Sequence, residues 1–332
     1  MKKFLSLLFV LILTVSLLAS CGNDETPDIP NADTKTNIKV SVLNGTTGFG
    51  MAHLMEQNTN GTAQNNYEFT VETAVDNVEK ALIAGTIDMA ALPTNSAAKV
   101  YNKTNGNVQI VAINTLGVLY LIDKTGEITS IDQLEGKTIY VPSNNPTFIT
   151  QHIINTNGVK NVTIDSTKYS NPQALQAAVK AGQVDYAVLP QPVVTAAVAG
   201  AKQAGFNYTI ALDLTNEWNA VNDEQLVQGC IVVRKDFATN NKNAIDKFLA
   251  EYEESIKFLN ENAKDASELI VKHNIFANAS VAEKAIPKCN VVYMVGAEMK
   301  SAMSAFVAAM YNIDKGSVGD KIPLDDFYYV SQ

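Results

Sequence analysis

The sequence predicts an α/β protein with two similar lobes, each built on a mostly parallel sheet flanked by helices. Helical and strand patterns alternate from residue 37 onward, which is typical of parallel strands joined by right-handed helical crossovers. One pattern, Gly-x-x-Asp-x-Ala-x-Leu-Pro, occurs twice, within residues 84–93 and 181–190. In each copy Gly is placed to end a helix and Pro to end a buried strand. A mature chain of about three hundred residues also suits two lobes better than one small core.

The first residues have the layout of a secretory leader. Two lysines precede an apolar stretch, residues 4–18, and small residues then precede Cys21. Leu18-Ala19-Ser20-Cys21 resembles a bacterial lipobox, so residues 1–21 are expected to be a lipoprotein signal peptide with Cys21 as the lipidation site, for example for palmitate. An ordinary signal with a chance cysteine is the alternative. Residues 22–36 are polar and rich in Asn, Asp, Pro and Thr, which predicts a flexible tether.

Elements of the first lobe follow in order. Alternating or branched apolar residues predict strands, and apolar residues at helical spacing predict helices. The expected strands are 38–43, 67–74, 87–92 and an apolar run over 108–122 that is interrupted at Asn114-Thr115; the expected helices are 49–57, 77–84 and 95–102.

The pattern then restarts as a second lobe. We expect a short helix at 130–135, strands at 137–141, 162–166, 184–189 and 209–214, and helices at 147–155 and 172–181. Residues 227–233 predict a strand that returns to the first lobe. The helices expected behind it, 243–260, 265–273 and 298–311, have no partner in the second lobe and should pack on the first.

The predicted organisation is therefore a discontinuous first lobe, residues 37–124 plus 227–332, around a second lobe, residues 125–226. Two crossing segments, near residues 121–127 and 222–228, form the predicted hinge.

Composition excludes several function classes. A net charge of −9 argues against nucleic acid and against electrostatic attraction to anionic lipid. Arg234 is the only arginine, so bidentate arginine clamps on phosphate or sulfonate are nearly absent. Cys230 and Cys289 remain after Cys21, and the sequence leaves open whether they form a disulfide or stay as two free thiols.

The order of elements, the segment Ile131–Ile139 and the paired Leu-Pro motifs together resemble a type II extracytoplasmic solute-binding protein of an ABC importer. The chain is similar to the nitrate/sulfonate/taurine/thiamine-precursor-binding group. The resemblance implies a two-lobed type II periplasmic-binding-protein fold, capture of a small-molecule solute in the cleft, and delivery to an ABC permease with its ATPase. It further implies a monomer outside the cytoplasm, attached to the bacterial membrane only through its lipid, without cofactor, metal site or catalytic residues.

Loops at the carboxyl ends of the strands are the candidate binding site, because helix N-termini direct free N–H groups there. For each loop, simple helix capping is the alternative. Trp218 could stack on a heterocyclic ligand or serve as a packing anchor, and Thr115 could face the cleft or mark a strand bend. The candidate ligand-binding residues are Asn44, Thr46, Thr47, Thr94, Asn95, Thr115, Ser143, Asn144, Thr147, Gln191 and Trp218.

The scarcity of arginine and the Asn/Thr/Ser loops favour an uncharged or heterocyclic ligand, and an anion held by helix N-terminal amides is the alternative. His53 and His152 each follow a candidate loop and could act as a general base or be partly buried helix residues. Enzymes of the same fold, of menaquinone or thiamine-precursor type, lack such a leader, which argues against catalysis. A ligand-sensing lipoprotein for a signalling receptor would share every feature of this sequence.

Overall fold

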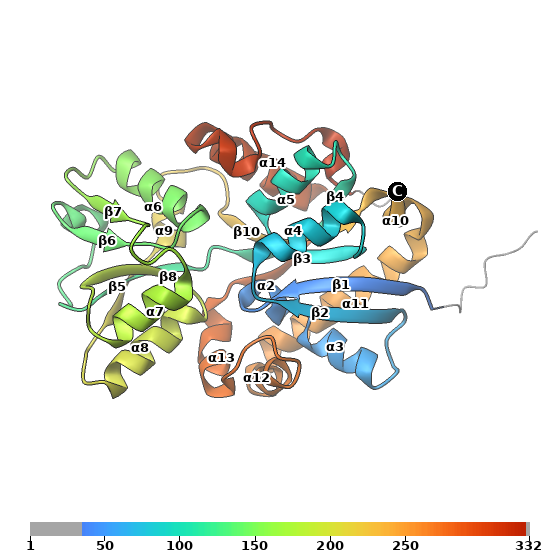
Figure 1. Ribbon diagram of the computed structural model, residues 1–332, viewed down its shortest axis with the longest axis horizontal. Coiled ribbons are helices and arrows are strands. Elements are labelled where there is room, and N and C mark those ends of the chain that lie inside the picture. The colour runs from blue at the N-terminus through green and yellow to red at the C-terminus, as the bar shows by residue number, and fades with distance from the viewer. Residues whose placement is uncertain (1–34, 330–332) are drawn as a thin grey trace, which may run out of the picture. The chain divides into compact units, whose positions relative to one another are not determined.

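A computed structural model describes residues 35–329, so the predicted signal peptide, Cys21 and nearly all of the predicted tether lie outside the described residues. Figure 1 shows two separate sheets joined by the crossing chain. The first sheet has six strands in the order β11-β4-β10-β3-β1-β2. Its strands are β1 (Asn37–Leu43), β2 (Asn66–Glu72), β3 (Met89–Pro93), β4 (Val108–Leu116), β10 (Val227–Arg234) and β11 (Val291–Met294).

The second sheet has five strands in the order β7-β6-β8-β5-β9. They are β5 (Leu119–Asp123), β6 (Thr138–Tyr140), β7 (Thr163–Asp165), β8 (Tyr186–Pro190) and β9 (Thr209–Asp213). Four helices pack with it: α6 (Asn145–Thr156), α7 (Pro172–Lys180), α8 (Val193–Gln203) and α9 (Leu214–Asn219). The predicted two-lobed α/β fold is confirmed.

The first sheet carries the remaining helices. From the first pass of the chain these are α2 (Thr46–Phe49), α3 (Ala52–Thr59), α4 (Val75–Ala84) and α5 (Thr94–Lys103). After the chain returns to this sheet through β10, it forms α10 (Lys235–Asn240), α11 (Lys242–Glu261), α12 (Ala263–Lys272), α13 (Ala279–Ala285) and α14 (Gly296–Ile313). Short 3₁₀ turns lie at Ile131–Leu134, Ile286–Lys288, Lys315–Val318 and Asp325–Phe327. The long helices at 242–261, 263–272 and 296–313 match the sequence expectation, whereas α13 and β11 were not predicted.

Both sheets are mixed. In each sheet the strand that follows a crossing between the sheets, called here the crossing strand, runs antiparallel to its neighbours. In the first sheet β10 is antiparallel to β3 and β4, whereas β1 is parallel to β2 and β3. In the second sheet β5 is antiparallel to β8 and β9, whereas β6 is parallel to β7 and β8. The repeated motif explains this likeness: its two copies form β3 and β8, and each pairs with a crossing strand.

The helices before the two motif copies end as predicted. Gly85 caps α4 in the left-handed conformation at φ 70°, and its N–H bonds the last carbonyls of the helix. Gly182, one residue beyond the C-cap of α7, has φ 66°. A residue with a Cβ would be strained at both positions.

The first crossing between the sheets lies at Gly117 and Val118, so its prediction at residues 121–127 is wrong. β5 already belongs to the second sheet, although the prediction assigned residues up to 124 to the first lobe. Asn114 and Thr115 do not interrupt the strand pattern, because both lie within β4. The second crossing, between the end of α9 and the start of β10, overlaps the predicted segment 222–228.

Asp123 ends β5 as a fully buried carboxylate. It accepts hydrogen bonds from the N–H groups of Thr125, Glu127 and Ile128 at 2.6, 2.7 and 2.9 Å. Burial alone would raise the pKa of Asp123, but the hydrogen bonds from Ile128, Thr125 and Glu127 outweigh it and hold the pKa below its usual value. The carboxylate therefore fixes the turn that leads into the second sheet.

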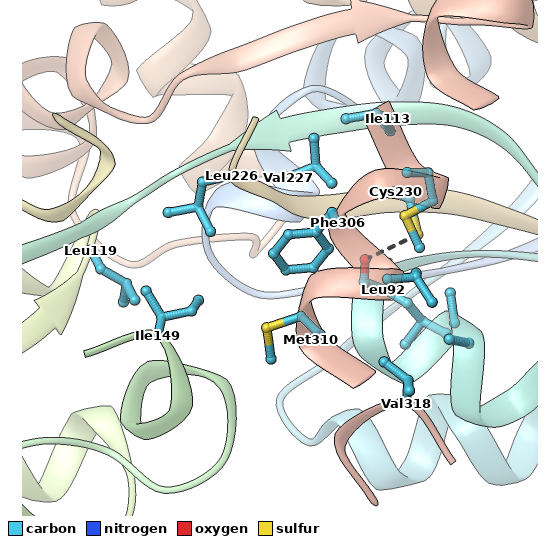
Figure 2. Packing of buried hydrophobic residues seen from close by; sticks show 14 of the residues in the cluster. Leu92, Ile113, Leu119, Ile149, Leu226, Val227, Cys230, Phe306, Met310 and Val318 are labelled. Carbon is cyan, nitrogen blue, oxygen red and sulfur yellow. Dashed lines mark hydrogen bonds between the residues drawn. The ribbon is translucent and has the colours of Figure 1, made fainter. Parts of the chain in front are cut away.

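The largest apolar cluster extends over both sheets. Figure 2 shows Phe306 and Met310 of α14 with Leu92 and Ile113 of the first sheet, and the same cluster includes Leu119 of the second sheet and Ile149 of α6. Cys230 and Cys289 are both buried free thiols, which resolves the question left open by the sequence. Among residues 35–329, no helix combines the length and hydropathy that a membrane span requires.

Candidate functional site

A cavity of about 310 Å³ lies where strand ends and helix starts of the two sheets meet. This volume is at the lower end of the range for small-molecule sites. The first sheet and its helices contribute Leu43, Asn44, Thr46, Thr47, Thr73, Val75, Pro93, Thr115 and Gln228, and the first crossing and the second sheet contribute Val118, Leu119, Asn145, Pro146, Pro172, Gln173, Pro190, Gln191 and Val193.

The two copies of the repeated motif meet at this cavity. Pro93 ends β3 and Pro190 ends β8, and both line the cavity. Each proline lies opposite a residue of a crossing strand, Gly229 for Pro93 and Leu119 for Pro190. Carboxyl ends of strands are the usual binding edge of such sheets, and the motif positions two of them around one space.

Four helices of nine or more residues begin at the cavity. Val75 opens α4, Asn145 opens α6, Pro172 opens α7 and Val193 opens α8, and all four residues line the space. First-turn N–H groups have no partner within their own helix, and they carry the positive end of the helix dipole. In α7 Pro172 has no N–H and the Ala174 N–H donates to the Asn171 side chain, so this helix contributes mainly through its dipole. None of the described lining residues is ionisable. The cavity is therefore uncharged in its side chains but favours negative charge through its backbone.

Two buried side chains among the lining residues carry polar atoms without a hydrogen-bond partner. Gln191 is 2% exposed, its Oε1 accepts from the Thr195 hydroxyl at 2.8 Å, and its Nε2 has no partner. Asn145 is 8% exposed, its Nδ2 donates to Asn95 Oδ1 at 2.9 Å, and its own Oδ1 has no partner. Buried polar atoms are rarely left without a partner, so a donor and an acceptor are both available here.

Thr47 and Thr115, called here the floor of the cavity, are held in place by the buried side-chain amide of Asn114. Its Nδ2 donates to Thr47 O at 3.0 Å and to the Tyr252 hydroxyl at 2.9 Å. Its Oδ1 accepts from the Thr115 hydroxyl at 3.0 Å. Gly229 lies against this group, because a Cβ there would come within 2.5 Å of Asn114 Oδ1. Asn114 thus positions both threonines that line the floor.

Direct hydrogen bonds bridge the two sheets beside the cavity. The Thr46 hydroxyl donates to Gln191 O at 2.7 Å. The Tyr120 hydroxyl donates to Lys288 O at 2.9 Å, and the Asn145–Asn95 bond also joins the two sides. The arrangement of the sheets and the shape of the cavity are therefore coupled.

The structure brings together Asn44, Thr46, Thr47, Thr115 and Gln191 among the predicted site residues, since all five line the cavity. Whether they bind a ligand stays a prediction. Thr115 lines the cavity and also lies where the pairing of β4 with β10 and β11 shifts register, so its position fits both the cleft-facing and the strand-bend alternatives.

Thr94 and Asn95 do not line the cavity. Thr94 is fully buried and its hydroxyl donates to Val227 O at 2.7 Å, which ties α5 to β10. Asn95 is buried behind Asn145, whose side chain it orients. Their contacts indicate support of the site, and ligand binding by either residue stays a prediction.

Side chains at the start of α6 and in the loop before it also hydrogen-bond to backbone carbonyls of the protein. The Ser143 hydroxyl donates to Ser166 O at 2.8 Å, and the Thr147 hydroxyl donates to Pro142 O at 2.9 Å. Asn144 adopts a positive φ of 68°. None of the three predicted residues is part of the cavity lining, because local hydrogen bonds hold the loop and leave Asn145 to face the space.

Trp218 is a packing anchor, so the stacking alternative is not supported. It is fully buried, its Nε1 donates to Glu224 O at 2.9 Å, and its ring lies 6.0 Å from Phe306 and 5.1 Å from His152 between centroids. His53 stacks on Phe258 with ring centroids 4.2 Å apart. Neither histidine lines the cavity, so the general-base alternative has no support there.

The candidates left out four polar lining residues: Thr73, Asn145, Gln173 and Gln228. Of these, Asn145 lies in the same polar loop as the candidates Ser143 and Asn144. Gln173 follows Pro172 in the first turn of α7, and Thr73 directly follows β2, so both carry the same signal as the residues that were found. Gln228 lies within a strand and its Oε1 accepts from Val118 N at 2.7 Å, which no local pattern indicates.

Comparison with known proteins gives one family and several structures. A family model described as an ABC transporter phosphonate periplasmic substrate-binding protein matches residues 51–281. No curated protein matches the chain in sequence.

Among solved structures, an ABC transporter protein from Parabacteroides distasonis is 22% identical, with a TM-score of 0.76 over 90% of this chain and 100% of that one. The periplasmic aliphatic sulphonate binding protein SsuA from Escherichia coli is 14% identical, with a TM-score of 0.66 over 90% and 96%. The periplasmic nitrate-binding protein NrtA from Synechocystis is 13% identical, with a TM-score of 0.56 over 76% and 70%. At these identities the structural matches show the fold.

Proposed function

Because this chain belongs to the phosphonate family of ABC transporter periplasmic substrate-binding proteins, we propose that it captures a small, singly charged oxyanion between its two sheets for delivery to a membrane permease. Its fold is that of the type II periplasmic-binding proteins. The observation that carries the proposed ligand class is the start of four helices at a cavity without ionisable side chains. Helix N-termini with free N–H groups bind anions without help from arginine.

The charge of the ligand follows from magnitudes. One helix N-terminus stabilises a nearby anion by about 0.3–1 kcal/mol, and by up to about 2 kcal/mol when partly buried. The cost of removing an ion from water is several kcal/mol and rises with the square of its charge. Four N-termini and their N–H groups can offset this cost for a monoanion, whereas a dianion would need cationic side chains. The sulphonate and nitrate named for two structural neighbours carry a single charge, which supports this choice.

The proposed mode of action is binding without catalysis. The lining residues in the described part of the chain offer amides, hydroxyls and apolar groups, but no side chain suited to general acid or base chemistry. Solute capture would favour the arrangement in which both sheets contact the ligand, because only differential affinity shifts such an equilibrium. The crossings at Gly117–Val118 and between α9 and β10 would serve as the hinge.

Thermal unfolding of the purified protein against a solute panel tests the proposal. The panel contains alkanesulfonates, alkylphosphonates, nitrate, sugars, vitamins and amino acids. A singly charged oxyanion at a hundred times its dissociation constant should stabilise the protein by about 2.7 kcal/mol. Stabilisation only by uncharged or cationic solutes, or by none, would contradict the proposed ligand class.

A pair of variants at Val193 isolates the role of charge. Val193 is the first residue of α8 and lines the cavity. Val193→Asp places a carboxylate where it should leave α8 stable but repel an anion, since acidic residues are favoured in the first turn. Val193→Asn is the matched neutral control. Loss of oxyanion binding in the Asp variant alone is expected, and equal binding by both variants would contradict the proposal.

We further propose that lipid on Cys21 holds the protein at the outer face of the bacterial membrane. The support is the lipobox-like sequence Leu18–Cys21, together with the periplasmic description of the family. Cys21→Ser should release the protein from the membrane fraction of cells into the soluble fraction while solute binding is unchanged. Retention of the variant in the membrane fraction would contradict the anchor.

A further inference from the structure

We infer that the solute carries a neutral hydrogen-bond donor, such as a hydroxyl or an amide N–H, in addition to its oxyanion. The inference rests on the proposed function and concerns the same cavity. It follows from three polar atoms around the cavity that can only accept hydrogen bonds.

The first such atom is Asn145 Oδ1. The side chain is 8% exposed, and its Nδ2 is occupied by Asn95 Oδ1 at 2.9 Å. Asn145 lines the cavity, and its Oδ1 is buried without a hydrogen-bond partner. An amide oxygen can only accept hydrogen bonds, so this atom requires a donor.

The hydroxyl oxygens of two threonines can likewise act only as hydrogen-bond acceptors. The single hydroxyl proton of Thr46 is donated to Gln191 O at 2.7 Å, and that of Thr115 is donated to Asn114 Oδ1 at 3.0 Å. Both residues line the cavity and are 7% and 1% exposed. With their protons committed, these oxygens can offer only lone pairs to a ligand. A bare oxyanion has no proton to give to any of the three acceptors.

Hydrogen-bond donors are present as well, so the cavity offers both donors and acceptors to a ligand. Gln191 Nε2 has no partner, because the other end of the amide is held by Thr195. The Gln228 Oε1 accepts from Val118 N at 2.7 Å, which leaves the Nε2 of this lining residue to donate. Together with the helix N-termini these groups suit the oxyanion, and the three acceptors suit a donor elsewhere on the same ligand.

The donor is neutral because the cavity offers no counter-charge to a cation. No Asp or Glu is among its described lining residues, and the four helix N-termini repel positive charge. A buried ammonium group without a carboxylate partner is strongly disfavoured. A hydroxyl or amide N–H satisfies the same acceptors without that cost.

Calorimetric titration with three matched probes tests the inference. Ethanesulfonate, 2-hydroxyethanesulfonate and 2-aminoethanesulfonate share one head group and differ in hydrogen, hydroxyl or ammonium. The hydroxyl compound should bind tighter than the other two by about tenfold or more, since an unsatisfied buried acceptor is costly. Equal affinities for the hydroxyl and unsubstituted compounds would overturn the inference, as would a preference for the ammonium compound.

Variants at Asn145 connect the selectivity to the proposed acceptor. Asn145→Leu should reduce the ratio of hydroxyl to unsubstituted binding to near one. Asn145→Asp should reverse the preference toward the ammonium compound. Gln151→Leu, at an exposed position of the same helix α6 and outside the cavity lining, is the matched control and should keep the original ratio. A ratio unchanged in Asn145→Leu would overturn the assignment of this residue.

The outcome separates this inference from the proposed function. Binding of ethanesulfonate without a hydroxyl preference rejects the donor and keeps oxyanion capture. Failure of all three probes to bind rejects the inference. If another class of solute in the panel then binds, only the proposed oxyanion is rejected. If no solute binds, solute capture itself is contradicted.

Discussion

Adding one methyl group at Gly117 should weaken solute binding from outside the cavity. Gly117 lies in the first crossing, and a Cβ there would come within 2.1 Å of Thr215 Oγ1 and 2.9 Å of Leu226 in the second crossing. Non-bonded heavy atoms do not approach so closely, so Gly117→Ala must separate the two crossings at a cost of about 1–3 kcal/mol. If this cost falls on the ligand-binding arrangement, affinity drops by about 5- to 150-fold.

Calorimetric titration with the tightest solute of the panel, alongside urea unfolding, measures both effects. Thr215→Ala is the internal control, because its Oγ1 is buried without a hydrogen-bond partner and its loss should cost little. In the double variant, Thr215→Ala should restore part of the affinity that Gly117→Ala removes. Wild-type affinity and stability in Gly117→Ala, or no restoration in the double variant, would refute the assignment of this contact to the hinge.

Three further predictions concern the floor, the second sheet and the core. Gly229→Ala would place a Cβ 2.5 Å from Asn114 Oδ1 and 2.8 Å from Thr47 Cγ2, so calorimetry should show at least about tenfold weaker binding; unchanged affinity would contradict the described floor. Asp123→Asn should lose about 1–3 kcal/mol of stability at neutral pH. Since the pKa of Asp123 is lowered by folding, its contribution is present above the unfolded pKa and is lost as pH falls through the folded pKa. The variant should therefore show a shallower acid dependence in urea unfolding, and an identical dependence would count against the prediction. Trp218→Phe should lower stability by about 1–3 kcal/mol with unchanged solute affinity, and a selective loss of affinity would revive the stacking interpretation.

Local signals account for the features that the sequence predicted well. The αL glycines and the Leu-Pro strand ends depend on a few neighbouring residues, so the repeated motif alone was enough to predict β3 and β8. Polar loops with Gly at strand ends likewise identified Thr46 and Thr47 as cavity residues, because strand ends and helix starts are adjacent in the chain.

The features that the sequence left open or misplaced depend on distant segments. Two roles were open for Trp218, and the choice between them depends on α14, which packs against it from far along the chain. The first crossing falls inside the largely apolar segment 108–122, where Gly117 marks the change of sheet. Asn145 belongs to the same polar loop as the candidates Ser143 and Asn144, but which of these side chains lines the cavity depends on the hydrogen bonds of the folded loop.

Solute binding in the cavity where the two sheets meet is the central claim. A crystal structure of the purified protein with its tightest solute from the panel tests this most directly. We expect the ligand between the sheets, with its oxyanion at the first turns of α6, α7 or α8 and within hydrogen-bond distance of Gln191 Nε2. A ligand found instead in the groove between α6 and α14, which is lined by His152 and Asn312 among others, would contradict the claim.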